Sequence, residues 1–115
     1  MLEALALCVA KISDGDTFWT FDRVKVRLVA ASGSVDAPDK KESPRCKPGA
    51  KGWCNQALAI RASQRLGQLI RGRGAVMQCN GHDKYRRVLC RVTVNCRDVG
   101  DTMVAEGLAV IRNDW

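Results

Sequence analysis

Short motifs in this chain combine carboxylates that could hold a hard cation with arginines that could hold a phosphate. These motifs are Asp14-Gly15-Asp16-Thr17, the segment around Arg27, Val35-Asp36-Ala37-Pro38-Asp39, and Asp83-Lys84-Tyr85-Arg86-Arg87. A cation, guanidinium groups and a carboxylate that activates water are what the hydrolysis of a phosphodiester needs. The sequence therefore indicates a site for that chemistry, provided that the fold brings these distant segments together.

Asp16 and Asp36 are candidate ligands of a divalent cation. Asp16 closes a predicted turn, and Asp36 lies in the long loop after the third predicted strand. Two carboxylates, backbone carbonyls and water would suit Ca²⁺, which takes about six to eight oxygen ligands at flexible distances. Taken alone, each segment also fits an ordinary turn, because Asp-Gly and Asp-Ala-Pro are common turn sequences.

Arg27 and Arg87 are candidate ligands of a phosphate. A guanidinium group presents a planar fork that can bond two phosphate oxygens, and it stays charged at any relevant pH. Charge that builds on phosphorus during hydrolysis would be stabilised by these groups and by the cation. The alternative is that Arg27 is a solvated strand residue and that Arg87 belongs to a plain basic pair. The neighbouring long loop weakens this alternative for Arg27, and the Asp83-Lys84-Tyr85 context weakens it for Arg87.

The composition is that of a globular protein with a basic surface. The chain has 115 residues, which fit one domain, and 46% of them are hydrophobic. Its net charge of +7 favours a polyanionic partner, either nucleic acid or an anionic membrane surface. The carboxylates beside the arginines favour DNA or RNA. No apolar run reaches the roughly 18 residues of a membrane span, and residues 2–10 lack the flanks of a signal peptide. We therefore expect no membrane partner.

Six cysteines permit disulfide bonds. Cys46 and Cys54 enclose a loop rich in Pro and Gly, and Cys79 and Cys90 would lie opposite each other in a hairpin. Both pairs are candidate disulfides, which favour a secreted or periplasmic location. The alternative is six reduced thiols in a cytoplasmic protein.

The order of the predicted elements indicates a mainly β fold. Expected strands cover residues 5–12, 17–21, 24–29, 75–79 and 88–94, with the first three as a meander. A long helix is expected at 53–70, and a short one that is capped by Asp98 and stopped by Gly107. Residues 30–52 are expected to form a long loop, and 108–111 an apolar segment that packs on the barrel. This order favours a five-stranded OB-fold barrel with one long and one short α-helix.

In order and approximate spacing, these motifs resemble the thermonuclease, or staphylococcal nuclease-like, family. The matching motifs are Asp-Gly-Asp-Thr, a strand with Arg-Leu, Asp-Ala-Pro followed by an acid, Asp-Lys-Tyr-x-Arg, and Asp-Val…Met-Val-Ala-Glu-Gly-Leu-Ala. The resemblance extends from about Ile12 to Ile111, and the five motifs in order form a specific signal. It implies an OB-fold barrel, a single domain over residues 1–115, and Ca²⁺-dependent cleavage of DNA and RNA.

The resemblance also implies roles for the individual residues that match the family motifs. Asp16 and Asp36 would bind Ca²⁺ together with the backbone carbonyl of Ala37. Arg27 and Arg87 would hold the scissile phosphate.

Four further positions match the family around the attacking water and the nucleotide. Asp39 stands where the family has a glutamate that orients or deprotonates this water. Lys84 and Tyr85 match positions that touch the nucleotide's other phosphate, and Trp115 lies where the family has an aromatic residue near the bound base.

The chain departs from the family pattern at several points. Asp39 is one methylene shorter than glutamate, and Glu42 is a nearby substitute. Residues 31–34 look like an insertion before Asp36, and Arg86 replaces a glycine. The family's C-terminal helix is missing or very short after Trp115.

These observations predict a metal-dependent nuclease with little sequence specificity, acting as a monomer. The alternative is a catalytically impaired OB-fold domain that binds nucleic acid. A third reading is a basic domain that binds other proteins.

Overall fold

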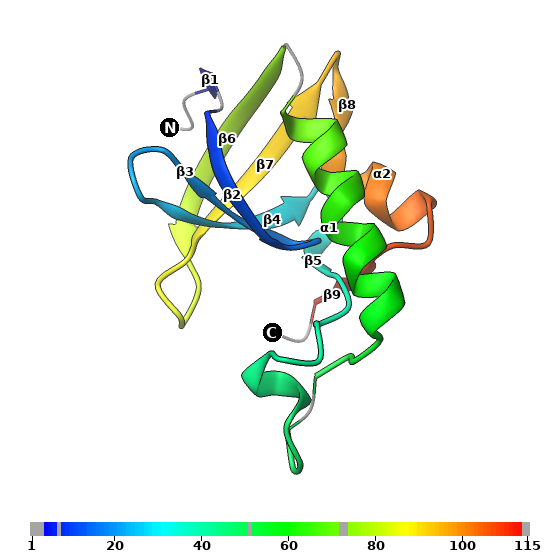
Figure 1. The fold of residues 1–115 in the computed structure, drawn as a ribbon. Helices are drawn as coiled ribbons and strands as arrows, with labels where there is room; N and C mark the ends of the chain where they lie inside the picture. The colour runs from blue at the N-terminus through cyan, green and yellow to red at the C-terminus, as the bar shows by residue number, and fades with distance from the viewer. Residues whose placement is uncertain (1–3, 7, 51, 72–73, 114–115) are drawn as a thin grey trace.

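The computed structural model describes residues 4–6, 8–50, 52–71 and 74–113. Its elements form a mostly β fold with two α-helices, which is OB-like as predicted (Figure 1). The strands are β1 (Ala4–Ala6), β2 (Val9–Asp14), β3 (Thr17–Thr20), β4 (Lys25–Ala30), β5 (Gly33–Asp36), β6 (Ala75–His82), β7 (Val88–Val94), β8 (Arg97–Asp98) and β9 (Val110–Arg112). The helices are a 3₁₀ turn (Pro44–Cys46), α1 (Gln56–Ile70) and α2 (Val99–Ala105).

The sheet has the order β1-β6-β7-β4-β3-β2, with β5 added to β4 and β9 to β5. β2, β3 and β4 form the predicted antiparallel meander, and β4 then pairs in parallel with β7. The residues expected to form one strand over 5–12 instead belong to β1 and β2. β1 pairs with β6, whereas β2 pairs with β3. This division lets one N-terminal segment contribute to both ends of the strand order.

Two differences from the sequence prediction concern residues 30–56. The expected loop contains β5, whose pairing with β4 closes a tight hairpin at residues 31–32. The long helix starts at Gln56 and not at 53, because Asn55 caps it by accepting a hydrogen bond from the Leu58 N–H at 3.1 Å. The short helix is capped as predicted, since the Asp98 side chain accepts from the Asp101 N–H at 3.0 Å.

The core lies between the inner face of the meander and the apolar faces of the two helices. Alternation along β3 and β4 points Phe18 and Val26 inward, and both are fully buried. α1 contributes small and large apolar residues at helical spacing, which are Ala59, Ala62, Leu66 and Ile70. This packing holds α1 against β2, beside the turn that carries Asp14 and Asp16.

Both predicted cysteine pairs are joined as disulfides. Cys46–Cys54 closes the loop before α1, and Cys79–Cys90 links directly paired residues of β6 and β7. These bonds are compatible with an extracellular or periplasmic location. In the described part of the chain, no helix is both long and apolar enough to cross a membrane.

Gly15 is required at the turn between β2 and β3 because α1 approaches it closely. A β-carbon on Gly15 would lie 2.6 Å from the Ala62 Cβ and 2.8 Å from the Ala37 Cβ. A side chain at this position would push apart the turn, the helix and the segment that follows Asp36.

We expect Gly15→Ala to lower the free energy of unfolding by about 1–3 kcal/mol, because it overpacks this contact. Gly67→Ala in the interior of α1 is the matched control, since its added methyl would meet only Ile12 at 3.8 Å. The control should raise stability by up to about 1 kcal/mol through helix propensity. Urea denaturation of both variants measures the difference. Equal effects of the two substitutions would contradict the close-approach argument.

Candidate functional site

Asp16 joins the first two acidic motifs. Its carboxylate is buried; Oδ1 accepts a hydrogen bond from the Thr17 hydroxyl at 2.8 Å, and Oδ2 accepts one from the Ala37 N–H at 2.9 Å. The second bond spans 21 residues and brings the end of β5, with Asp36, to the turn before β3. The structure thus brings together Asp16, Asp36 and Ala37, the three predicted metal ligands.

Arg27 lies beneath the same cluster. It is 2% exposed; its Nη2 donates to the Val35 carbonyl at 2.8 Å and lies 3.9 Å from the Asp16 Oδ2. Residues 31–34, which look like an insertion in the sequence, form the turn and the start of β5 in the β4–β5 hairpin. This hairpin places the Val35 carbonyl on the guanidinium, so the extra residues help to hold Arg27 in place.

Arg87 reaches the cluster from the turn between β6 and β7. Its Nε donates to the Asp83 Oδ2 at 2.6 Å, and its Nη1 donates to the Thr17 hydroxyl at 3.3 Å. Burial alone would raise the pKa of Asp83, but hydrogen bonds from Arg87 and Tyr85 hold that pKa below its ordinary value. Arg86 has a φ of 65°, so the position occupied by a family glycine does require a left-handed backbone.

Lys84 and Tyr85 lie at the exposed tip of the same turn. Tyr85 is 62% exposed, and the Lys84 Nζ and the Arg87 Cζ lie 5.3 and 5.4 Å from its ring centroid. The aromatic ring is therefore held beside the arginine that reaches the acidic cluster. Trp115, the aromatic residue predicted to lie near the bound base, is outside the described residues.

Asp36 has a partner that sequence reasoning missed. Arg112 on β9 donates from Nε to the Asp36 Oδ2 at 3.0 Å, across 76 residues of sequence. The β5–β9 register pairs Ser34 with Arg112 and Asp36 with Val110, so Arg112 is the diagonal neighbour of Asp36. The available signal in the sequence was that a basic residue, Arg112, directly follows the predicted apolar segment 108–111.

Asp39 is buried against the loop that the Cys46–Cys54 disulfide closes. Its N–H donates to the Trp53 carbonyl at 2.6 Å, and the Arg45 Nε lies 3.6 Å from its Oδ2. A β-carbon on Gly52 would lie only 2.9 Å from the same oxygen. The chain therefore packs the predicted water-activating carboxylate beneath a covalently closed loop, a contact that sequence reasoning also missed.

Three of the clustered carboxyl groups resist ionisation. Burial, together with the charges of Asp16 and Asp39, raises the pKa of Asp14 to about 6, although Lys40 and Lys25 oppose the shift. Burial also raises the pKa values of Asp36 and Asp39; Arg112 and Arg45, respectively, oppose these shifts. Negative charges that repel one another in a buried site favour an added cation.

The donor set fits a hard cation, since it consists of carboxylate oxygens and backbone carbonyls. Asp16 and Asp36 would hold the ion, and the remaining ligands would be the Ala37 carbonyl and water. Within the described ranges, no three His, Cys, Asp or Glu side chains are grouped as metal ligands. A cation held here would therefore have two carboxylate ligands, Asp16 and Asp36.

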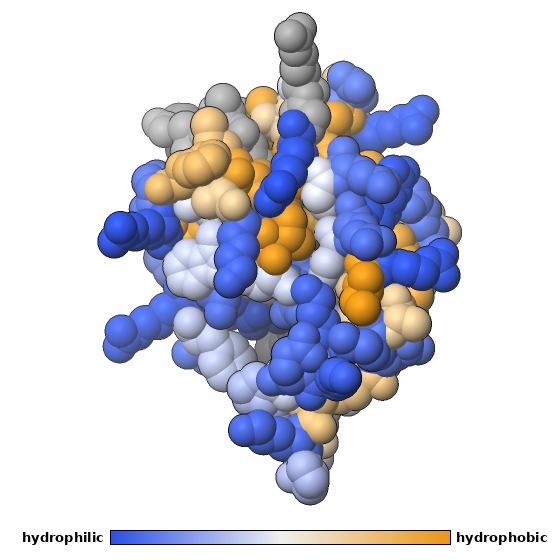
Figure 2. Space-filling view, in the orientation of Figure 1, coloured by the Kyte–Doolittle hydropathy of each residue, from blue (hydrophilic) through white to orange (hydrophobic). Residues whose placement is uncertain are grey.

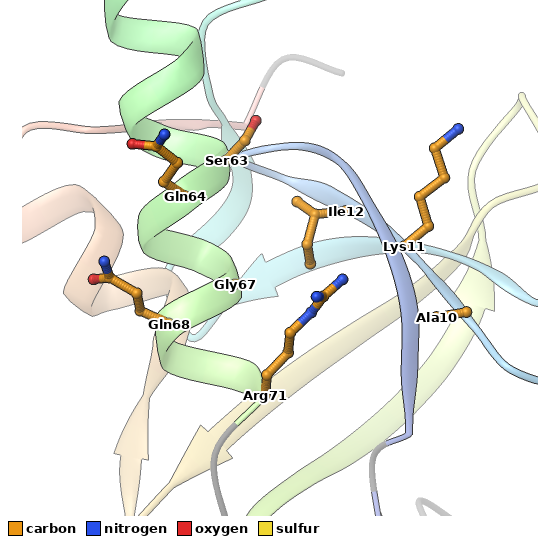
Figure 3. Close-up of a pocket in the computed structure, with 8 residues that line it drawn as sticks. All are labelled: Ala10, Lys11, Ile12, Ser63, Gln64, Gly67, Gln68 and Arg71. Atoms are coloured by element: carbon orange, nitrogen blue, oxygen red, sulfur yellow. The ribbon is translucent and has the colours of Figure 1, made fainter.

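A hollow elsewhere on the surface is not part of this cluster. It has a volume of about 560 Å³, lies between β2 and α1, and is lined by Ala10, Lys11, Ile12, Ser63, Gln64, Gly67, Gln68 and Arg71 (Figure 3). None of the predicted site residues lines it. Phosphodiester chemistry is therefore indicated by the acidic and guanidinium groups of the cluster and not by the shape of this hollow.

Comparisons with known proteins identify the family of this chain. A family model described as staphylococcal nuclease homologue matches residues 25–115. The chain is also similar to an uncharacterized endonuclease of Haemophilus influenzae, with 29% identity over 105 residues. This match covers 88% of the chain and 49% of the relative, so the chain spans about half of that protein's length. The chain belongs to the staphylococcal nuclease family.

Proposed function

We propose that this protein is a Ca²⁺-dependent nuclease that hydrolyses phosphodiester bonds of DNA or RNA with little sequence specificity. The observation that carries the proposal is the convergence of Asp16, Asp36, Arg27 and Arg87, which come from four separate segments. Thr17 bridges this group, because it donates to Asp16 and accepts from Arg87.

Each side chain has one part in the proposed reaction. Asp16 and Asp36 would hold the cation, which when bound would supply Lewis-acid chemistry at a phosphoryl oxygen. Arg27 and Arg87 bind the scissile phosphate and stabilise the charge that develops on it. Asp39 orients the attacking water or takes its proton. Burial raises the pKa of Asp39 and so brings it closer to the range of a general base.

Lys84 and Tyr85 contact the nucleotide's other phosphate, and Trp115 is proposed to contact a base. Low sequence specificity follows because the phosphate ligands address the backbone, which carries no base identity. The net charge of +7 attracts such a polyanion. On the face shown in Figure 2, long hydrophilic side chains project outward over much of the surface.

We further propose that residues 1–115 act as one nuclease-like domain and as a monomer. A secreted or periplasmic location would suit the two disulfides.

A catalytically impaired domain that binds nucleic acid is the second candidate. The contact between Asp39 and the disulfide loop favours it, because the Oδ2 atom faces Gly52 and Arg45. A protein in which the Asp39 carboxylate is held there would keep its basic surface and its arginines, but it would activate water poorly.

Digestion of single-stranded DNA separates these two functions. We expect cleavage with Ca²⁺ and none with a chelator, and a loss of more than about tenfold in kcat/KM for both Arg87→Ala and Asp39→Ala. Arg71→Ala, an exposed residue of the hollow beside α1, is the control and should cleave at the normal rate. Equal cleavage by all four proteins would reject the site. Binding without cleavage would favour the impaired domain.

The disulfide loop should position Asp39. Replacing Cys46 and Cys54 with serine frees the loop that accepts the Asp39 N–H, so this amide should exchange faster with solvent. Cleavage should fall by about tenfold or more, since small displacements of a catalytic group are costly. The matched control replaces Cys79 and Cys90, whose bond lies on β6 and β7. Removing either disulfide should lower the free energy of unfolding by about 2–3 kcal/mol. Equal protection of the Asp39 amide in both double variants would contradict the positioning role.

Arg112 should compete with the metal for Asp36. Arg112→Gln removes a cation that holds one Asp36 oxygen, so the protein should bind Ca²⁺ more tightly. Because the Arg112 side chain is 43% exposed, its pair is weak, and we expect about a 1.5- to 5-fold lower Kd in calorimetry. Arg91→Gln, which breaks the distant pair with Asp98, is the charge-matched control. A lower affinity in Arg112→Gln than in the control would show that Arg112 supports the metal site.

A further inference from the structure

The outer face of the β2–β3–β4 meander carries a row of side chains that the proposed reaction does not use. The registers pair Trp19 with Lys11 on β2 and with Lys25 on β4. Directly paired residues project from the same face of a sheet. The row therefore places one indole between two ammonium groups.

This row adjoins the candidate site. The same strands pair Thr17 with Asp14 and with Arg27, and Thr17 lies two residues before Trp19. Residues two apart along a strand share a face and lie about 7 Å from each other. The Lys11–Trp19–Lys25 row is thus the next row along the face that holds Arg27 and receives Arg87.

The two faces of the meander differ in chemistry. On the inner face, Phe18 and Val26 are fully buried in the core. In Figure 3, Ile12 lies between β2 and α1, whereas the Lys11 side chain extends away from α1. On the outer face, the Lys25 Nζ lies 5.7 Å from the centroid of the Trp19 ring. Phe21, in the turn after β3, is 72% exposed.

We propose that the Lys11–Trp19–Lys25 row is a binding site for a single-stranded segment of nucleic acid that extends from the scissile phosphate. The indole would stack on an unpaired base, and the two ammonium groups would pair with the flanking phosphates. Aromatic residues interleaved with cations bind single strands in this way without reading their sequence. A preference for single-stranded over duplex nucleic acid follows, because bases in a duplex are already stacked on each other and present no free face to Trp19.

The inference rests on the proposed function only in that Arg27 and Arg87 mark the scissile phosphate. The β2–β3–β4 meander would then favour single-stranded over duplex substrates. A nucleic-acid strand fits this row because its charge is complementary to the two lysines and because the row continues from those arginines.

The test is the binding of a fluorescein-labelled eight-residue oligothymidylate, followed by anisotropy in the presence of a chelator so that no cleavage occurs. Trp19→Leu keeps an apolar side chain but removes the stacking face, and it should weaken binding by about fivefold or more. Trp19→Phe keeps an aromatic face and should bind within about twofold of the wild type. Melting temperatures confirm that both variants fold.

An abasic oligonucleotide of the same length and a duplex of the same sequence identify the contact. The wild type should prefer the oligothymidylate to the abasic strand, and Trp19→Leu should reduce that preference by about fivefold or more while binding the duplex unchanged. Lys11→Gln combined with Lys25→Gln should reduce the slope of log K against log salt by about 1.4, for two phosphates. Arg61→Gln on α1 combined with Arg71→Gln at its C-cap is the charge-matched control and should leave the slope nearly unchanged.

Two outcomes would overturn the inference. One is equal binding of the oligothymidylate by Trp19→Leu and the wild type. The other is an equal loss on the abasic strand and on the oligothymidylate. Failure of the proposed function is distinguishable, because it would appear as absence of Ca²⁺-dependent cleavage while the dependence of binding on Trp19 persists.

Discussion

The buried carboxylate of Asp16 is the interaction on which the rest of the site depends. It accepts hydrogen bonds from the Thr17 hydroxyl and from the Ala37 N–H, and Arg27 lies 3.9 Å away. A buried charge is costly unless it is paired and hydrogen-bonded, so these contacts must persist in the folded state. Since Ala37 follows Asp36, satisfying Asp16 also delivers the second acidic residue to the site.

The same need for compensation explains the arrangement of the surrounding charges. Asp36 pairs with Arg112, Asp39 lies beside Arg45, and Asp83 pairs with Arg87. Each carboxylate therefore has a guanidinium group near it, but the pKa values of Asp36 and Asp39 remain raised. Burial is the main cause of these raised pKa values, and the charge of Asp16 adds to both. The proposed cation would offset that repulsion, and the arginines would remain available for a phosphate.

Much of the fold could be predicted from local patterns. Alternation in residues 24–29, the capping residue Asp98 and the apolar spacing in α1 each indicated an element that the structure contains. The predictions were wrong where long-range pairing decides the outcome. The segment 5–12 divides between two strand partners, and residues 31–34 join a hairpin, because strand pairing depends on distant residues that local propensity does not describe.

The sequence by itself determined which groups are available: the carboxylates, the arginines, the small glycine in the first turn and the cysteine pairs. Only the tertiary structure decided how they meet. Arg112 reaches Asp36 because of the β5–β9 register, and Asp39 lies beneath a disulfide-closed loop. Trp19 stands between Lys11 and Lys25 because two separate strand registers coincide at one residue. Spacing along the chain does not encode these contacts, because register is set by the burial of whole strand faces.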